Sequence, residues 1–358
     1  MTKLVFLILI IVFVSLLNTT SITAAHANED SSYDHTICIF SVIICLNDQS
    51  QQLEESEKPA NEEFIHSVIN QVNSTKLKNW IDDLSSFHTR HTKSEYIENI
   101  AYWLKNELKS VCNGKVYFHN FTRIDQGIGY NLKNIICNQE GSGEAHDNNN
   151  NDHHPLILIS AHYDSRMQDI NQTNARAPGA DDNASGVAAV LELARILSQV
   201  DLKNNIQFVL FSGEEQGQWG STAYVNYVQT NNTKIDLVMN LDMIGYSALG
   251  LDNVVIEYDV GNKFTTNDMY SKKVGQFIEQ IALDYANLEA LLHPLGKTDL
   301  IPFEAIGKTV IGIHDGGSKL NPNYHNTSDT PDTLNIEYFT SVTKLVLAAI
   351  LNIDKLNQ

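Results

Sequence analysis

The sequence predicts an α/β fold, a three-layer αβα arrangement around a mixed, mostly parallel central sheet. After Pro155, short β-branched runs alternate with amphipathic helical segments, which is typical of a sheet with helices on both faces. Polar residues with metal-ligand chemistry follow several of these runs, where open α/β sheets place their ligand sites. No internal repeat is visible, so one domain over residues 62–358 accounts for most of the chain.

The expected strands of this domain are short apolar runs rich in β-branched residues. They cover residues 156–160, 206–212, 235–241, 254–258 and 309–313. The expected helices show apolar residues three and four positions apart. They cover residues 185–200, 216–230, 267–285 and 336–356, with Ser185 capping the first.

The segment before Pro155 is expected to add two helices and a pair of strands. Apolar spacing predicts a helix from Glu62, and a second helix is expected to begin at Ser94 as its N-cap. Residues 115–123 and 130–137 are predicted to be the strands.

Charge and composition exclude two classes of protein. The chain has 358 residues, with 24 Lys and Arg against 43 Asp and Glu, a net charge of −19. Affinity for a polyanion depends on basic side chains, so we expect no nucleic-acid partner. A hydrophobic content of 42% is too high for a disordered acidic chain.

The N-terminal region is expected to be a targeting segment followed by an extension. Residues 1–27 contain a lysine, an apolar run of residues 4–17 and a final small-residue pattern, which indicates a cleaved signal peptide. An uncleaved anchor is the alternative. Residues 28–61 are interpreted as a pro-segment or surface extension. The mature chain is therefore expected in a secreted or endolysosomal location, without a membrane span.

The four cysteines favour disulfides over a metal site. They are even in number and show no Cys-x-x-Cys spacing, although sequence leaves three pairings open. We expect Cys38 to pair with Cys45, and Cys112 with Cys137. Asn-x-Ser/Thr sequons, including Asn73, make the mature chain a candidate glycoprotein.

Two segments of the second half offer the first candidate metal ligands. His162 and Asp164 follow strand 156–160 and are two residues apart, so His162 can bind a metal while Asp164 orients it from behind. The Gly-flanked loop 178–186 then offers Asp182, whose carboxylate can bridge two cations. Ordinary helix capping explains one of its acids but not two in a row.

Carboxylates also follow the next two predicted strands. Glu214 and Glu215 are adjacent at a buried strand end, where they repel each other unless they share a cation or a proton. One can bind metal while its neighbour accepts a proton from water. Asp242 follows another apolar strand, and His325 lies in a polar turn before the last helix.

Two imidazoles and three carboxylates form the complete candidate set. This set suits Zn²⁺, and one carboxylate remains to bridge a pair of ions. The expected ligands are His162, Asp182, Glu215, Asp242 and His325.

These segments resemble the secreted co-catalytic di-zinc aminopeptidases of metallopeptidase family 28, relatives of glutamate carboxypeptidase and glutaminyl cyclase. The resemblance covers residues 156–330 and rests on motifs that occur in family order. They are His-x-Asp-Ser, Gly-Ala-Asp-Asp-Asn-Ala-Ser-Gly, Ser-Gly-Glu-Glu, Asn-Leu-Asp-Met-Ile-Gly and Tyr-His-Asn-Thr-x-Asp-Thr. The resemblance implies a fold of the zinc-dependent exopeptidase type and two zinc ions per chain.

The resemblance also implies individual roles. One zinc would be held by His162, Asp182 and Asp242, and the other by Asp182, Glu215 and His325. Glu214 would be the general base for a zinc-activated water, Asp164 the carboxylate behind His162, and Tyr324 a phenol near the developing oxyanion. The implied substrates are peptides with a free N-terminus, cleaved at the N-terminal bond.

Three alternatives stay open at this point. A glutaminyl cyclase would use a single zinc. A carboxypeptidase of the same family would need a basic pocket, for which Arg166 and Arg176 are candidates. A catalytically dead binding ectodomain is the third. Sequence does not settle the preferred N-terminal residue or the oligomeric state.

Overall fold

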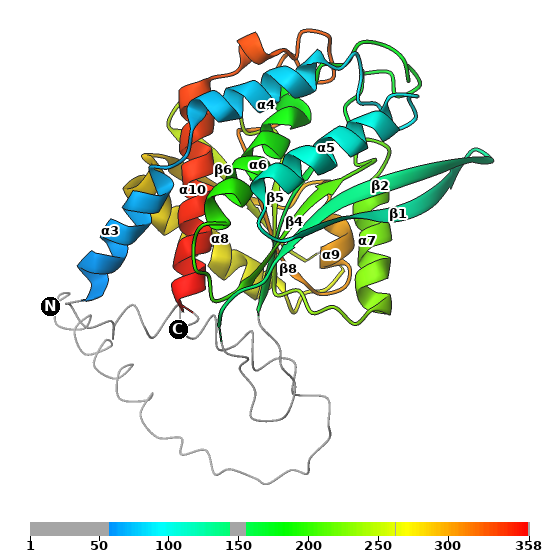
Figure 1. Cartoon of the computed structure of the whole chain (residues 1–358). Helices are drawn as coiled ribbons and strands as arrows, with labels where there is room; N and C mark the ends of the chain where they lie inside the picture. Colours follow the sequence, from blue (N-terminus) through cyan, green and yellow to red (C-terminus); the bar gives the residue numbers. More distant parts are fainter. Residues whose placement is uncertain (1–56, 144–154, 262, 357–358) are drawn as a thin grey trace, which may run out of the picture. The chain divides into compact units, whose positions relative to one another are not determined.

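The computed structural model describes residues 57–143, 155–261 and 263–356, and its centre is one eight-stranded sheet (Figure 1). The strands are β1 (Lys115–Asp125), β2 (Ile128–Gln139), β3 (Leu156–His162), β4 (Asn205–Phe211), β5 (Leu237–Leu241), β6 (Asn253–Tyr258), β7 (Glu289–Pro294) and β8 (Thr309–His314). Their order across the sheet is β1-β2-β4-β3-β5-β8-β6-β7.

Parallel pairing dominates the middle of this sheet. Strands β4, β3, β5 and β8 are parallel neighbours, and β6 is parallel to β7. The pairs β1–β2, β2–β4 and β6–β8 are antiparallel. The mixed, mostly parallel α/β sheet that the sequence predicts is therefore confirmed.

Helices cover both faces of the sheet, as expected. They are α3 (Glu57–Ile69), α4 (Ser74–Ser86), α5 (Ile97–Val111), α6 (Gly186–Leu197), α7 (Trp219–Thr230), α8 (Asp268–Ala286), α9 (Ile301–Glu304) and α10 (Ile336–Leu356). Helices α5, α6 and α8 pack against strands on one face, with α10 against α8 and α4 (Figure 1). Helices α7 and α9 contact each other and the sheet on the opposite face.

Strand β4 shows why its sequence is apolar throughout. Alternate side chains of a strand point to opposite faces, and both faces of this strand are covered by helices. Phe208 and Leu210 belong to the core beneath α6, whereas Val209 and Phe211 belong to the core beneath α7 and α9. All four are fully buried, so the strand ends of this region are fixed firmly relative to one another.

Both expected serine caps are corrected by the structure. Ser94 lies in a turn, where its backbone N–H donates to His91, and α5 begins only at Ile97. Ser185 precedes α6 but makes no capping bond, because its hydroxyl donates to the Asp181 carbonyl and accepts the Ile244 amide. Ser185 therefore stands at the N-cap position of α6, but its hydroxyl bonds to the preceding turn and to the chain after β5 rather than to the helix.

Three elements of the structure were not predicted from the sequence, namely α4, β7 and α9, and the start of α7 differs from its predicted position. Helix α4 begins after Asn73, whose side chain accepts the Lys76 amide as a genuine N-cap. Edge strand β7 and the single-turn helix α9 are too short or too exposed to show clear periodicity. Helix α7 begins at Trp219 rather than at residue 216, because Gly217 and Gln218 have positive φ angles.

One of the two expected disulfides is present. Cys112 follows the end of α5 and is bonded to Cys137 in β2, which ties the helix to the sheet. The other expected pair, Cys38 with Cys45, lies outside the described residues. The predicted signal and extension boundaries remain predictions.

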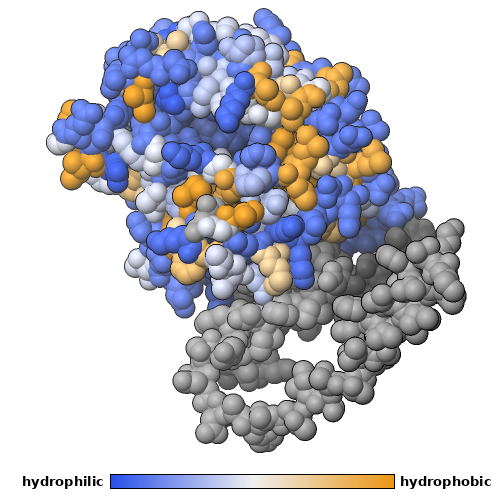
Figure 2. Space-filling model, turned by 180° about the vertical axis from the view of Figure 1, so that it is seen from behind, coloured by the Kyte–Doolittle hydropathy of each residue, from blue (hydrophilic) through white to orange (hydrophobic). Residues whose placement is uncertain are grey.

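Helix α10 is long and apolar enough to cross a membrane by composition, and among the described residues it alone meets that test. Of its most apolar stretch, 67% is buried inside the domain, where it forms part of the hydrophobic core. The surface seen in Figure 2 is mostly hydrophilic, with apolar patches between the polar side chains. Large exposed apolar residues elsewhere include Ile124 and Ile128, beside the β1–β2 turn.

Candidate metal centre

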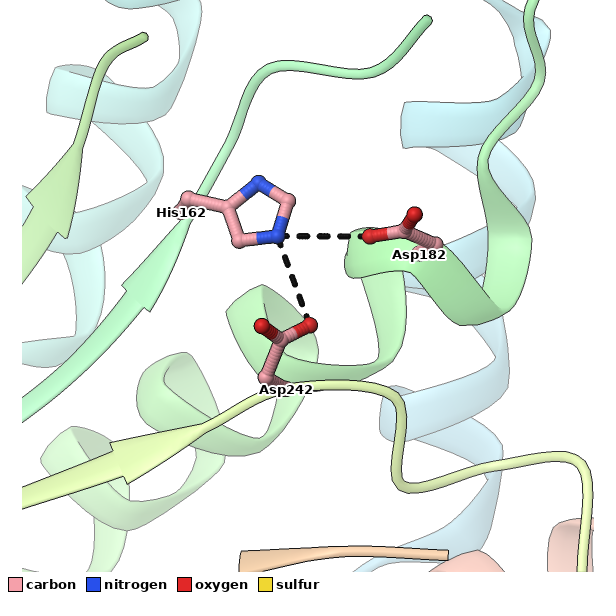
Figure 3. A group of neighbouring side chains, drawn as sticks. All are labelled: His162, Asp182 and Asp242. Carbon is pink, nitrogen blue, oxygen red and sulfur yellow. Dashed lines mark ion pairs between the residues drawn. The ribbon is translucent and has the colours of Figure 1, made fainter. Parts of the chain in front are cut away.

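The first ligand group lies at the carboxyl ends of β3 and β5. His162 is the last residue of β3, and its Nε2 lies 3.3 Å from Asp182 Oδ1 and 3.4 Å from Asp242 Oδ1 (Figure 3). Figure 3 shows both carboxylates turned toward the same ring nitrogen. His162 and Asp182 are buried, and Asp242 is partly exposed. These donor atoms can converge on one cation.

The second group shares Asp182 with the first. His325 Nε2 lies 3.0 Å from Asp182 Oδ2 and 3.0 Å from Glu215 Oε2, and all three residues are buried. One oxygen of Asp182 thus faces His162, and the other faces His325. A single carboxylate connects two groups of three donors.

The donor set fits zinc. Each group offers one imidazole and two carboxylates whose ligand atoms lie within 4.8 Å of one another. Buried carboxylates this close repel one another unless positive charge lies between them. Burial by itself raises the pKa of Asp182, but its hydrogen bonds with His162 and His325 outweigh burial and lower that pKa below the ordinary value. The site is therefore built to keep Asp182 ionised.

A buried arginine holds the loop that carries Asp182. Arg90 is fully buried, and its Nε donates to the Tyr163 carbonyl at 2.8 Å while Nη2 donates to the Gly179 carbonyl at 2.8 Å. Its Nη1 donates to the carbonyls of Leu84 and Pro178. One guanidinium therefore joins the ends of α4, β3 and the Asp182 loop.

The loop around Asp182 is further fixed by the polar turn that follows His325. Asp329 Oδ1 accepts the Asp181 amide at 2.9 Å, and its Oδ2 accepts the Asp182 amide at 3.1 Å. Asp181 itself points away from the two ligand groups: its oxygens accept the Gly245 amide and the Asn321 side chain. The structure thus separates two adjacent acids into a candidate ligand and a loop anchor.

Asp164 does more than the expected support of His162. Its Oδ1 lies 3.6 Å from His162 Nδ1, which also contacts the Asp164 carbonyl at 3.2 Å. The same carboxylate accepts the backbone amides of Gly213, Glu214 and Glu215 and the hydroxyl of Thr92. Asp164 therefore fixes the backbone of the Glu214–Glu215 turn as well.

Glu214 follows β4, is partly buried and is the sequence neighbour of the candidate ligand Glu215. Its Oε1 accepts the Gln218 side chain at 2.9 Å. Burial raises the pKa of Glu214 well above its ordinary value, and the negative charges of Asp299 and Glu215 raise it further. A carboxylate with a raised pKa is a better proton acceptor near neutral pH.

Tyr324 and Arg166 lie on the His325 side of the centre. The Tyr324 ring stacks on the His325 ring, with centroids 3.6 Å apart. Burial and the surrounding carboxylates raise the pKa of Tyr324, so its phenol stays protonated. Arg166 Nε donates to Glu215 Oε2 at 2.8 Å, whereas Arg176 contacts the carbonyl of Ser85. Only one of the two arginines considered for a carboxylate pocket is at the centre.

At this edge of the sheet the structure brings together the five candidate ligands with Asp164, Glu214, Tyr324 and Arg166, whereas Arg176 lies apart. Sequence reasoning missed Arg90, Thr92 and the loop-anchoring role of Asp329, because polar residues in turns carry no periodic signal. Asp329 is the acid of the Tyr-His-Asn-Thr-x-Asp-Thr motif, whereas Arg90 and Thr92 lie outside the quoted motifs.

Comparison with known proteins agrees with this geometry. Residues 143–350, more than half of the chain, match the sequence profile of peptidase family M28. The chain belongs to peptidase family M28. Its metal-ligand motifs all lie within the matched residues.

Among curated M28 relatives, a leucine aminopeptidase 1 of Trichophyton equinum is 26% identical over 309 residues. That alignment covers 81% of this chain and 77% of the relative. A probable zinc metalloprotease of Pyrenophora tritici-repentis is 28% identical over 198 residues, covering 51% of this chain. The alignment spans only 39% of that longer protein.

Solved structures confirm the M28 fold. The LapA aminopeptidase of Legionella pneumophila matches with a TM-score of 0.67 at 21% identity, over 82% of this chain and 75% of that one. A glutaminyl cyclase of Bacteroides thetaiotaomicron matches with a TM-score of 0.65 at 18% identity. The match covers 79% of this chain and 98% of the cyclase. Since both activities occur on this fold, the site must decide between them.

Proposed function

We propose that this M28 peptidase is a di-zinc aminopeptidase that hydrolyses the N-terminal bond of peptides, with Glu214 as general base. The observation that carries the proposal is the placement of Asp182, whose two oxygens face His162 and His325 in two complete donor groups. A shared carboxylate between two such groups is the arrangement that a pair of metal ions requires.

Each of the two donor groups would hold one zinc ion. His162 and Asp242 would hold one zinc, Glu215 and His325 the other, and Asp182 both. When bound, the zinc ions would supply Lewis acidity, which polarises a carbonyl and lowers the pKa of water.

Glu214 would move the proton. Its raised pKa and its position next to the candidate ligand Glu215 suit a group that takes a proton from water and returns it to the leaving amine. The hydrogen bond from Gln218 would hold the carboxylate in one orientation. Tyr324 keeps its phenolic proton and can donate a hydrogen bond to an oxyanion that forms beside His325.

Acidic side chains would restrict cleavage to the chain end. Glu214 and Asp242 have no lysine or arginine partner among the described residues, and a free α-ammonium group is attracted to such negative charge. An acetylated N-terminus carries no charge and would lose this interaction.

Specific observations bear on the alternatives. The complete second donor group disfavours a glutaminyl cyclase with one zinc, although cyclases share the fold. Arg166 favours a carboxypeptidase, but its guanidinium is paired with Glu215, and Arg176 is directed to α4. No candidate ligand is lost among the described residues, which disfavours a dead binding domain.

The decisive experiment is hydrolysis of a panel of aminoacyl amides and their N-acetyl counterparts, with and without a chelator. Free aminoacyl amides should be cleaved, their acetylated forms should not, and the chelator should stop the reaction. Equal cleavage of free and blocked substrates would overturn the aminopeptidase assignment. Pyroglutamate formation with one zinc per chain would favour the cyclase.

We further propose a secreted or endolysosomal location. The Cys112–Cys137 bond supports it, because structural disulfides persist in oxidising compartments. N-terminal sequencing of protein recovered from the medium or lumen tests it: a mature terminus near residue 28 is expected.

A further inference from the structure

A buried carboxylate lies beside the metal centre and is used by none of the steps above. Glu257 is in β6 and is 6% exposed. Its nearest ionisable partner is His314, the last residue of β8, with His314 Nε2 3.5 Å from Glu257 Oε1. Among the described residues, no lysine or arginine is paired with Glu257.

Strand register places this pair on the same face of the sheet as the metal centre. Leu241 of β5 pairs with Ile313 of β8, so the next residues, Asp242 and His314, are lateral neighbours. Neighbouring strands lie about 4.8 Å apart. Glu257 pairs with Gly312, two residues before His314, and therefore projects from the same face as His314. The strand order of the sheet places β8 between β5 and β6.

Two glycines make room for the Glu257 carboxylate. A Cβ atom added to Gly312 would lie 2.9 Å from Glu257 Oε2, and one added to Gly296 would lie 3.0 Å from Oε1. The Gly296 amide donates to Oε1 at 3.1 Å. Within the described part of the chain, Oε2 accepts no hydrogen bond. One oxygen is therefore anchored, and the other is left for an incoming donor.

The electrostatics of the pair favour positive charge. The Gly316 amide donates to His314 Nδ1 at 3.0 Å, which leaves the ring proton on Nε2, the nitrogen that faces Glu257. A neutral His314 ring faces the Glu257 carboxylate without cancelling its charge. A buried carboxylate with so few donors is stabilised by any cation that reaches it.

The two flanks of the centre differ in the negative charge that they offer to a substrate. On the His325 side, Arg166 already neutralises Glu215, and the Tyr324 ring covers His325. On the Asp242 side, the next strands carry His314 and Glu257. A substrate whose terminal carbonyl lies at the centre can direct the side chain of its first residue to this second flank.

We propose that Glu257 receives the side chain of the substrate's N-terminal residue and selects lysine and arginine over apolar residues of the same size. The inference rests on the proposed aminopeptidase function and adds its substrate class. A lysine ammonium or arginine guanidinium supplies the missing donor to Oε2. An apolar side chain would instead cover the carboxylate and leave it without a partner, at a cost in binding.

Matched substrates test the proposal on the unaltered protein. The p-nitroanilides of lysine and norleucine have side chains of similar length with and without charge, and those of arginine and citrulline form a second pair. For each pair we expect kcat/KM to be at least about tenfold higher for the charged member. Calorimetry with free L-lysine and L-norleucine gives a second readout, in which lysine should bind more tightly.

The variant Glu257→Gln keeps the shape and removes the charge. It should lower kcat/KM for the lysine substrate at least about tenfold and change that for norleucine by less than about threefold. Glu279→Gln removes the same charge from an exposed position of α8 and should leave both values unchanged.

These experiments distinguish a failure of the Glu257 proposal from a failure of the proposed aminopeptidase function. Equal rates within both substrate pairs would overturn the role of Glu257 while leaving aminopeptidase activity intact. Loss of the lysine and norleucine rates to the same extent in a folded Glu257→Gln protein would also overturn it. If that variant does not fold, the substrate pairs and calorimetry still decide. Failure to cleave any free aminoacyl substrate would overturn both proposals.

Discussion

The Asp164 carboxylate accepts the backbone amide of Glu215, with Oδ2 3.2 Å from the nitrogen. Asp164 follows β3, and Glu215 follows β4, so the contact joins the ends of two parallel neighbours. The residue that lies behind His162 also sets the position of a candidate ligand of the other group. The two halves of the centre are consequently built as one unit.

Glu214→Gln should reduce kcat by at least about 10²-fold and leave zinc content unchanged. The amide occupies the same space but cannot accept a proton from water. Steady-state kinetics with elemental analysis of the same sample checks both expectations. Near-normal turnover would contradict the role of Glu214, and the exposed Glu279→Gln variant controls for loss of charge.

Asp182→Asn should lower zinc content more than Asp242→Asn does. Asp182 belongs to both donor groups, whereas Asp242 belongs to one. Elemental analysis after equilibrium dialysis should therefore find both ions weakened in the first variant and one retained in the second. Equal losses in the two variants would contradict a shared carboxylate.

Asp299→Asn should flatten the pH dependence of stability of the metal-free protein. Burial raises the pKa of Asp299 to about 7, although Ser221 donates to its Oδ1 at 2.6 Å. A carboxyl with a raised folded-state pKa stabilises fully below its unfolded value. That contribution is lost as pH rises through about 7.

The loss for Asp299 is on the order of 4 kcal/mol between pH 4 and 8. Asparagine mimics the protonated acid and should remove most of this slope. Urea unfolding of chelator-treated protein at several pH values measures it. Parallel pH curves for wild type and variant would show that Asp299 does not titrate in this range.

Arg90→Lys should destabilise the fold and disturb the metal centre together. Lysine cannot reach four carbonyl groups at once, so buried acceptors would lose their donors at a cost of roughly 3 kcal/mol or more. Denaturant unfolding and zinc affinity should both decrease. Arg176→Lys alters an exposed arginine with one long hydrogen bond and serves as control. Equal stability of the two variants would refute the role of Arg90.

The sequence by itself determined the fold class, five of the six strands after Pro155 and the candidate ligands. This was possible because buried strands must be apolar, and because polar residues at their carboxyl ends stand out against them. His162, Asp182 and Asp242 could each be identified from the end of such a run or from a glycine-flanked loop.

Only the tertiary structure decided how these residues are held and what surrounds them. In the folded chain, one Asp182 oxygen faces His162 and the other faces His325. The Asp181 side chain points away from the ligands and accepts the Gly245 amide, and the Ser185 hydroxyl accepts the Ile244 amide instead of capping α6. The tertiary structure also placed Glu257 beside the centre through the pairing of β6 with β8. Such contacts join residues far apart in the chain, and local spacing and propensity carry no information about them.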